Sequence, residues 1–170
     1  MAKVLITGAS GFIGYHVTKY FLKKGDTVYA FYRNESFLNI LNYPQLICKK
    51  FEIKSTNDLS FLNSEGIDYL VHLAWENVKD INNDSHVVQS IPNHLNFIKN
   101  AVKKFNIKNV FLLGSCFEYG LVSGCINENI KVCPVTKYGL AKYKLGQKLL
   151  KLSAKLNFNY THGRLFYVYG

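Results

Sequence analysis

The chain has 170 residues, which suits one domain, and 48% of them are hydrophobic, enough to form a sizeable core. No stretch has the apolar length of a membrane span, and residues 1–6 enter a strand directly, without the layout of a signal peptide. The formal net charge of +10 favours anionic ligands such as nucleotides, but the lysines are scattered in ones and twos, so we expect no nucleic acid and no membrane as partner. Because the four cysteines form no CxxC pair, we expect no metal site and no disulfide framework, and a reducing cytoplasm is the natural compartment.

The first predicted elements are a strand, a glycine turn and a helix, in KVLITGASGFIG. The run Val4–Ile6 is apolar and branched, as in a buried parallel strand, and apolar residues then recur at helical spacing from Phe12. Gly8 permits a tight turn, Gly11 lets the backbone approach a pyrophosphate, and Gly14 lets the helix pack close to the strand. The spacing is GxxGxxG rather than GxGxxG, and a glycine turn without a ligand is the alternative. The flanking strand and helix favour dinucleotide binding.

A second strand is predicted over residues 27–32, and the position where it ends bears on the choice of cofactor. In NAD-binding folds this position, about 20 residues past the glycine turn, holds an acidic residue that binds the ribose 2′-hydroxyl. Here it holds Tyr32, followed by Arg33 and Asn34, and an arginine can form a forked pair with a 2′-phosphate. The sequence therefore favours NADP over NAD, and a solvated Arg33 is the alternative interpretation.

The rest of the chain alternates between predicted strands and helices. Further strands are predicted over residues 46–53, 69–74, 110–113 and 160–168, and helices over Asp58–Leu62 with Asn57 as N-cap, over 87–105 with Pro92 near its start, and over 136–156. This alternation predicts an α/β fold with a doubly wound, Rossmann-type parallel sheet in the order 3-2-1-4-5-6. We therefore expect one nucleotide-binding domain over residues 1–170, with ligands beyond the carboxyl ends of its strands.

Three residues after the fifth predicted strand have side chains suited to moving a proton. Ser115 lies at the carboxyl end of that strand, and Tyr138 and Lys142 stand four apart on the last helix, where they share one face. A phenol with a pKa near 10 is a poor base, but a neighbouring ammonium lowers that pKa. With Ser115 bonded to the same substrate oxygen, the set suits proton transfer while a nicotinamide carries a hydride. Ordinary helix surface is the alternative for Tyr138 and Lys142.

The chain resembles the extended short-chain dehydrogenase/reductase family, in its branch of nucleotide-sugar epimerases, dehydratases and reductases. The matching segments span the whole chain: TGASGFIG (7–14), HLA (72–74), GSCFEYG (114–120), YGLAK (138–142) and RLFYVYG (164–170). The resemblance implies that Tyr138 is the general acid/base, that Lys142 lowers its pKa and holds the nicotinamide ribose, and that Ser115 orients the substrate oxygen. It also implies three sets of cofactor contacts: Gly8, Gly11, Phe12 and Ile13 on the pyrophosphate, Leu73 and Ala74 along the cofactor, and Glu52 or Ile53 on the adenine.

One departure from the family's pattern narrows the expected reaction. The family's sugar dehydratases carry Asp and Glu directly after the active hydroxyl residue, where this chain has Cys116 and Phe117. Without those acids the elimination of water lacks proton carriers, whereas reduction of a ketone needs only Ser, Tyr and Lys. The segments HLAWE, GSCFEYG and RLFYVYG are similar to those of reductases of nucleotide-linked 4-keto-6-deoxy sugars, such as the enzymes that make dTDP-6-deoxy-L-talose. We expect such a reduction in surface-polysaccharide precursor synthesis, with a nucleotide-sugar 4-epimerase as the alternative.

The length of the sequence differs from the family's pattern as well. Family members continue past the last matching segment into further sheet and a smaller substrate-binding domain, whereas this sequence stops at Gly170. We therefore expect a fragment or a truncated gene product, and a nucleotide-binding module without turnover is a second hypothesis. The sixth strand would then be an edge with exposed Leu165, Phe166 and Val168. The resemblance further implies a possible homodimer through the helices near 87–105 and 136–156.

Overall fold

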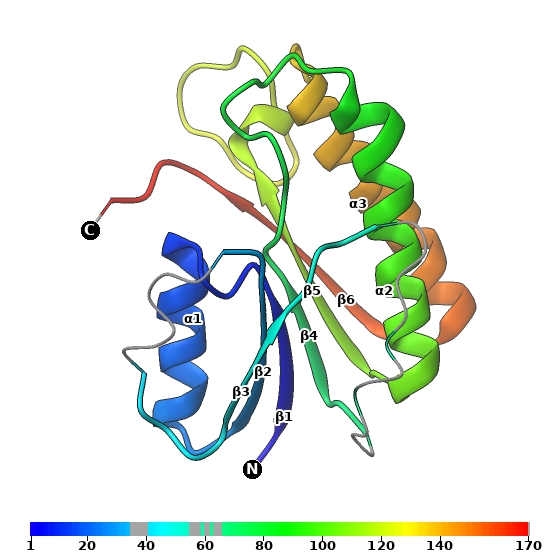
Figure 1. Ribbon diagram of the computed structural model, residues 1–170. Helices are drawn as coiled ribbons and strands as arrows, with labels where there is room; N and C mark the ends of the chain where they lie inside the picture. Colours follow the sequence, from blue (N-terminus) through cyan, green and yellow to red (C-terminus); the bar gives the residue numbers. More distant parts are fainter. Residues whose placement is uncertain (35–40, 55–58, 60–61, 63–65, 170) are drawn as a thin grey trace.

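The computed structural model describes residues 1–34, 41–54, 59, 62 and 66–169, and within them six parallel strands form one sheet (Figure 1). Their order across the sheet is β3 (Leu46–Lys50), β2 (Thr27–Tyr32), β1 (Lys3–Thr7), β4 (Tyr69–His72), β5 (Asn109–Ser115) and β6 (Asn159–Leu165). This confirms the predicted order 3-2-1-4-5-6. The predicted helix over Asp58–Leu62 and its N-cap Asn57 lie outside the described residues, except for Leu59 and Leu62, which are buried.

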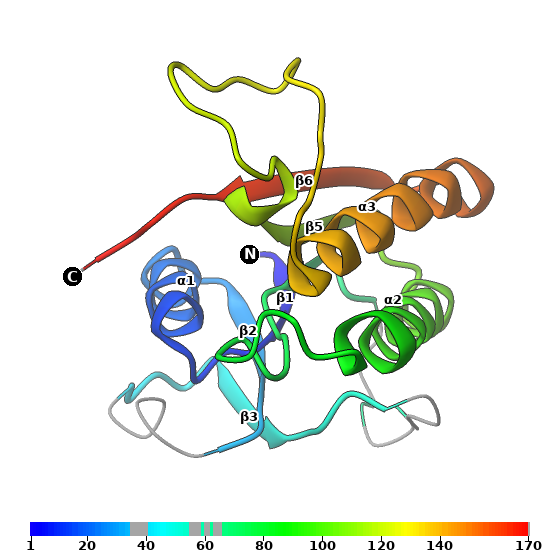
Figure 2. The ribbon, with the colours of Figure 1, turned by 90° about the horizontal axis from the view of Figure 1, so that it is seen from above.

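Helices cover both faces of the sheet. The helix α1 (Phe12–Lys23) lies on one face, and α2 (Ile91–Phe105) and α3 (Lys137–Leu156) lie side by side on the other (Figures 1 and 2). Alternate side chains of β1 serve the two faces: Val4 and Ile6 belong to the core under α1, and Leu5 belongs to the core under α2 and α3. Because both faces of the central strands are buried, β1 and β4 are largely apolar runs, whereas the edge strands β3 and β6 contain polar residues and are more exposed.

Three of the strands end earlier than predicted, and in each case one partner strand ends at the same level, although β5, the other partner of β4, continues to Ser115. The last pairs are Tyr32 with Lys50, Thr7 with His72, and Ser115 with Leu165. A strand needs a neighbour for its ladder of hydrogen bonds, so the apolar residues beyond these pairs leave the sheet. They leave it at the carboxyl ends of the strands. There the connection after β1 leads to β2 on one side of the sheet and the connection after β4 leads to β5 on the other side, so a crevice opens between β1 and β4.

The helix predicted over residues 87–105 is interrupted near its start. A π-helical turn, η2 (His86–Ser90), precedes α2, and Pro92 lies in the first turn of α2. Proline has no N–H to donate to the preceding turn. Its presence near the start of the predicted helix therefore favours an interruption at this point. Beyond β6, Phe166 and Val168 are exposed as expected at a sheet edge, whereas Leu165 is half-buried.

Candidate active site

The turn between β1 and α1 has the close backbone packing that its glycines predict. Gly8 has a φ of +71°, and a Cβ added to it would lie 2.8 Å from the backbone nitrogen of Ala74. A Cβ on Gly14 would collide with the carbonyl oxygen of Gly8. The turn therefore needs glycine at both positions, and it brings the end of β1 against the segment that follows β4.

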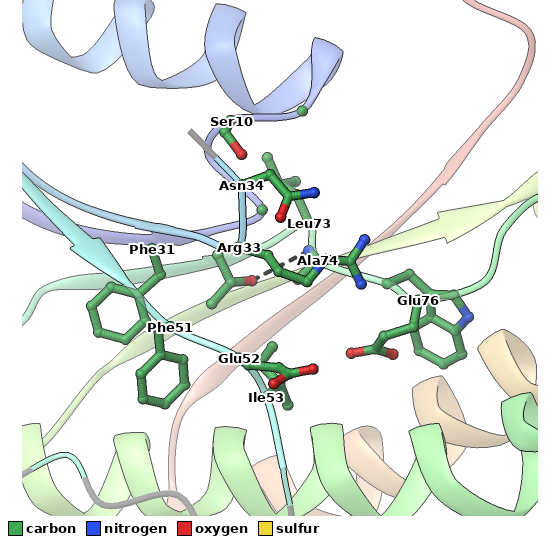
Figure 3. A pocket seen from close by; sticks show the side chains of 14 residues that line it. Ser10, Phe31, Arg33, Asn34, Phe51, Glu52, Ile53, Leu73, Ala74 and Glu76 are labelled. Atoms are coloured by element: carbon green, nitrogen blue, oxygen red, sulfur yellow. Dashed lines mark hydrogen bonds between the residues drawn. The ribbon is translucent and has the colours of Figure 1, made fainter. Parts of the chain in front are cut away.

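A cavity of about 440 Å³ opens at the carboxyl ends of β1, β2, β3 and β4 (Figure 3). Seven of the predicted cofactor residues line it: Gly8, Gly11, Arg33, Glu52, Ile53, Leu73 and Ala74. Sequence reasoning missed the other seven lining residues, which are Thr7, Ser10, Phe31, Asn34, Phe51, Trp75 and Glu76. Most of them directly flank a predicted residue in the sequence. The sequence therefore located the loops that line the cavity, but it did not show how many residues of each loop face the cavity.

The remaining predicted cofactor residues do not line this cavity. Phe12 begins α1 and is 46% exposed, Ile13 follows it in the first turn, and Gly14 is buried in the turn. Tyr32 packs against the core under α1, and its role at the ribose position stays a prediction. Tyr138 and Lys142 lie farther along, beyond β5 and next to Trp75.

The residues of the cavity fit a dinucleotide. A Cβ on Gly11 would meet only the carbonyl oxygen of Gly8, at 3.4 Å, so packing within the protein does not require glycine at this position. Gly11 nevertheless lines the cavity and caps α1, whose first turn contains no acidic side chain. The first N–H groups of a helix have no partner within the helix, and they attract anions. Bare backbone and a helix N-terminus at one cavity suit a pyrophosphate.

Ser115 is held at the end of β5 by the short helix η3 (Cys116–Glu118). The Ser115 hydroxyl accepts a hydrogen bond from the Phe117 N–H at 3.3 Å, and the Ser115 N–H donates to Glu118 Oε1 at 2.9 Å. This reciprocal pair is a capping box. Glu118 is fully buried and also binds His162 at 3.1 Å and Arg164 at 2.9 Å, so it ties β5 to β6 beneath the serine.

Tyr138 lies beside η3, where its ring is 5.9 Å from the ring of Phe117, because α3 begins very close to η3. Thr136 caps α3 by accepting from the Gly139 N–H at 3.0 Å, and a Cβ on Gly139 would collide with the carbonyl oxygen of Phe117. The Tyr138 N–H donates to the Ile81 carbonyl oxygen at 2.8 Å, which fastens the first turn of α3 to the loop after β4. The sequence contains this signal as the glycine of YGLAK, but sequence reasoning did not use it.

Lys142 lies one helical turn after Tyr138 and is 1% exposed. Its ammonium nitrogen donates to the Leu113 carbonyl oxygen at 2.8 Å and lies 4.2 Å from the centre of the Trp75 ring, over its face. Burial lowers the pKa of Lys142 to about 7, although Glu118 and Glu76 act in the opposite direction. Near neutral pH a large share of the molecules therefore carries a neutral amine at this position.

The expectation that Lys142 lowers the pKa of Tyr138 is wrong for this structure. Burial raises the pKa of Tyr138, and the charges of Glu118 and Cys116 raise it further, while a hydrogen bond with Ser115 lowers it. The Lys142 nitrogen lies 5.8 Å from the centre of the Tyr138 ring and makes its hydrogen bond to Leu113. Burial thus decides the direction of the shift, and Tyr138 is a neutral phenol at ordinary pH.

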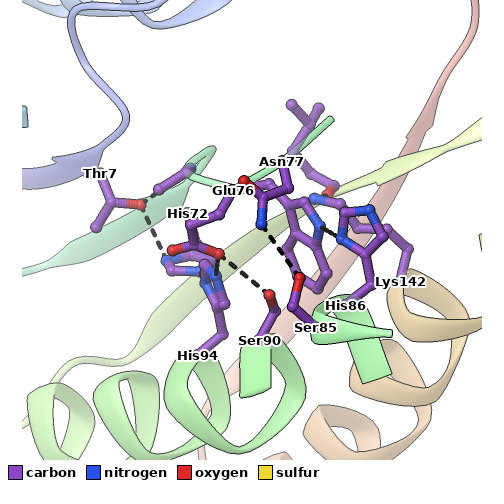
Figure 4. A network of polar contacts seen from close by, with 12 residues as sticks. Thr7, His72, Glu76, Asn77, Ser85, His86, Ser90, His94 and Lys142 are labelled. Atoms are coloured by element: carbon purple, nitrogen blue, oxygen red, sulfur yellow. Dashed lines mark hydrogen bonds and ion pairs between the residues drawn. The ribbon is translucent and has the colours of Figure 1, made fainter. Parts of the chain in front are cut away.

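A chain of hydrogen bonds runs behind the cavity from Thr7 to Glu76 (Figure 4). Thr7 Oγ1 lies 3.0 Å from His72 Nδ1, and His72 Nε2 lies 2.6 Å from His94 Nδ1. His94 Nε2 lies 2.9 Å from Glu76 Oε2, which also accepts from the Ser90 hydroxyl at 3.3 Å. Burial lowers the pKa of both histidines, so both imidazoles are neutral near pH 7. Sequence reasoning missed this network, because its members are brought together only by the fold.

The residues that the structure describes also bear on other kinds of site. No group of three or more His, Cys, Asp or Glu side chains in this part of the chain could hold a metal ion. Among the helices that the structure describes, none is both long and apolar enough to cross a membrane.

The sheet order and the crevice at its switch point define an α/β protein of the Rossmann type. The chain belongs to the NAD dependent epimerase/dehydratase family, whose model matches residues 4–170. A relative from Aggregatibacter actinomycetemcomitans, a dTDP-6-deoxy-L-talose 4-dehydrogenase (NAD(+)), is 28% identical over 98% of this chain. An uncharacterized UDP-glucose epimerase, YtcB of Bacillus subtilis, is 26% identical over 86% of it. The chain spans 62% and 50% of the lengths of these two relatives.

Solved structures share the fold at lower identity. A UDP-glucuronic acid 4-epimerase from Bacillus cereus, in complex with UDP-glucuronic acid and NAD, superposes with a TM-score of 0.84 at 23% identity. The alignment covers 99% of this chain and 57% of the epimerase. DesIV, a dTDP-glucose 4,6-dehydratase from Streptomyces venezuelae with NAD and TYD bound, gives a TM-score of 0.82 at 21% identity, over 95% of this chain and 55% of the dehydratase.

Proposed function

We propose that the protein is an NAD(P)-dependent oxidoreductase of a nucleotide-linked sugar, and that it reduces a 4-keto-6-deoxy sugar for surface-polysaccharide synthesis in the cytoplasm. One observation carries the proposal: Ser115 lies near enough to Tyr138 to lower its pKa, and both lie beside the buried Lys142, next to the crevice of a dinucleotide fold. The relative whose name specifies a dTDP-6-deoxy-L-talose 4-dehydrogenase supports the choice of sugar. The four cysteines, which are all free, are compatible with a reducing compartment.

In this proposal each side chain has a separate role in the reduction. A bound nicotinamide supplies the hydride. Tyr138 donates its phenolic proton to the carbonyl oxygen of the sugar, and Ser115 donates a hydrogen bond to the same oxygen. Lys142 would hold the nicotinamide ribose, and the N-terminus of α1 with Gly8, Gly11, Phe12 and Ile13 would hold the pyrophosphate.

The protonation state of Tyr138 favours the reductive direction. The raised pKa keeps the phenol neutral, and the neutral phenol is the form that donates a proton. Oxidation of a hydroxyl would instead need the phenolate, which burial disfavours at this position.

Substitution of Tyr138 by phenylalanine tests the assignment. The variant loses the proton donor but little volume, so we expect the rate of keto-sugar reduction to fall about 100-fold or more, with cofactor binding retained. Tyr143→Phe makes the same chemical change on the same helix, outside the trio, and serves as the matched control. Reduction is followed by the loss of NAD(P)H absorbance, and a Tyr138→Phe protein that keeps the wild-type rate would show that the assignment is wrong.

Two alternatives from the sequence make different predictions in the same assay. A nucleotide-sugar 4-epimerase interconverts two sugars without net consumption of NAD(P)H, which chromatography of the products detects. A nucleotide-binding module binds the cofactor in calorimetry but turns over none of the keto-sugars tested. Cofactor consumption with one reduced sugar as product would exclude both alternatives.

For the cofactor we propose NADP in preference to NAD. Arg33 is exposed, lines the cavity and lies directly beyond β2, where the adenosine ribose of a dinucleotide would lie. A charge-assisted pair with a 2′-phosphate contributes roughly 1.5–3 kcal/mol before desolvation, or about one to two powers of ten in affinity.

The Arg33→Ala variant tests this preference. We expect the wild-type chain to bind NADPH at least about tenfold more tightly than NADH, and the variant to bind both alike. Lys24→Ala, which removes a charge at the far end of α1, controls for the general positive field. Equal dissociation constants in the wild-type protein, measured by calorimetry, would refute the arginine argument and leave the catalytic assignment untouched.

A further inference from the structure

We propose that Glu76 is a specificity-determining residue that makes the cavity bind the oxidised, cationic nicotinamide more tightly than the reduced, neutral one. The proposal rests on the proposed function, since it assumes that the cavity holds a nicotinamide dinucleotide. It assigns a charge preference to a side chain that neither the glycine turn nor the Ser–Tyr–Lys set includes.

The position of Glu76 points to the nicotinamide half of a dinucleotide. In a doubly wound sheet the adenosine lies by the end of the second strand, and the other half crosses the switch point toward the fourth and fifth strands. Glu76 follows β4, lines the cavity and is 27% exposed at its side chain. Figure 3 shows its carboxylate at the opposite end of the cavity from Phe31 and Phe51. Trp75, its neighbour in the sequence, contacts Tyr138 and Lys142.

The hydrogen-bond chain behind the cavity fixes the carboxylate and orients every donor toward it. A carboxylate only accepts, so His94 Nε2 carries a hydrogen, and the neutral His94 must then accept at Nδ1 from His72 Nε2. His72 Nδ1 is thereby left to accept from the Thr7 hydroxyl, which itself accepts from the Ala74 N–H at 3.3 Å. Hydrogen bonds aligned in this way strengthen one another.

This arrangement keeps Glu76 ionised despite partial burial. Burial raises the pKa of the carboxyl group, but the hydrogen bond and charge interaction with His94 and the hydrogen bond from Ser90 lower it by more. Lys142 is the other buried charge nearby, and its pKa of about 7 leaves it mostly neutral in mildly alkaline solution. A fixed negative charge therefore faces a nicotinamide that bears a positive charge only when it is oxidised.

The test is the ratio of the dissociation constants of NADH and NAD⁺, measured by calorimetry at mildly alkaline pH. We expect this ratio to fall about tenfold in Glu76→Gln, because the oxidised form loses its attraction and the reduced form does not. A tenfold change corresponds to ~30 mV in the potential of a bound two-electron couple. Glu52→Gln, at the other carboxylate of the cavity, is the matched control and should leave the ratio unchanged.

A second variant examines His94 as a positioning residue. In His94→Leu the carboxylate loses its buried donor, so its pKa rises and the NADH to NAD⁺ ratio should fall as the solution is acidified. The wild-type ratio should change over the same range only through the protonation of Lys142 near pH 7, a change that the variant shares and that the comparison of the two proteins cancels. Melting curves and ADP affinity verify that each variant retains its fold and adenosine site.

The outcomes separate this inference from the proposed function. A wild-type chain that binds neither the oxidised nor the reduced form of NAD(H) or NADP(H) contradicts the proposed function itself. Binding of both forms with the same ratio in the wild type and in Glu76→Gln contradicts only the role of Glu76. An equal shift in Glu52→Gln would also overturn the proposal, since the effect would then reflect total charge.

Discussion

At the scale of single residues, Lys142 shows how one helix position combines a functional group with a cost in stability. A lysine that is 1% exposed, with its ammonium between Trp75 and the Leu113 carbonyl, has lost nearly all of its water. The pKa of about 7 reports that loss, since the ordinary value is 10.5. The unfolded chain therefore binds one more proton than the native chain between these two pH values.

This difference predicts a pH dependence of stability. Because the unfolded state holds the extra proton, the free energy of unfolding should rise with pH between about 7 and 10.5, by up to ~1.4 kcal/mol per pH unit. Lys142→Met keeps the apolar stem and should remove this contribution. The measurement is urea unfolding at several pH values, and subtracting the variant cancels the opposite contributions of the tyrosines and Cys48. Parallel pH profiles for the two proteins would contradict the buried-charge argument.

At the scale of elements, local patterns predicted each strand that the structure describes and the order of the sheet. They did so because buried parallel strands are apolar throughout and because a glycine turn after the first strand fixes the direction of winding. The same patterns placed the ends of three strands too late, since residues 51–53, 73–74 and 166–168 are as apolar as the strands themselves. Only the end of the neighbouring strand shows where the ladder stops.

Part of the candidate site could be predicted from the sequence and part could not. Ser115, Tyr138 and Lys142 could be found from the sequence because they lie in two short segments with a helical spacing between the last two. Glu118 could not, because its partners His162 and Arg164 stand 44 and 46 residues away. His94 and Glu76 are 18 residues apart and meet only after α2 packs beside β4. Residues that lie this far apart in the sequence form no periodic pattern from which their contact could be predicted.

At the scale of the whole molecule, the positive charge is concentrated where a homodimer was expected. A groove of about 430 Å³ is lined by residues of α2 and α3. Its apolar residues are Leu95, Leu152 and Leu156, and five lysines surround them: Lys99, Lys103, Lys148, Lys151 and Lys155. Neither helix contains an aspartate or a glutamate. A second copy docked on this groove would therefore bring two sets of lysines together without a compensating acid from these helices.

Self-association through α2 and α3 should therefore strengthen with salt, in contrast to association driven by opposite charges. The apolar residues of the groove favour contact, and the lysines oppose it over the Debye length, which shrinks from ~10 Å at about 0.1 M salt to ~3 Å at about 1 M. We expect sedimentation equilibrium to give a mainly monomeric chain at the lower ionic strength and tighter dimers at the higher one. Lys99→Gln combined with Lys151→Gln should produce dimers at the lower ionic strength, whereas Lys3→Gln with Lys24→Gln, outside the groove, should not. A dimer that weakens as salt rises would show that these helices do not pair with their own copies.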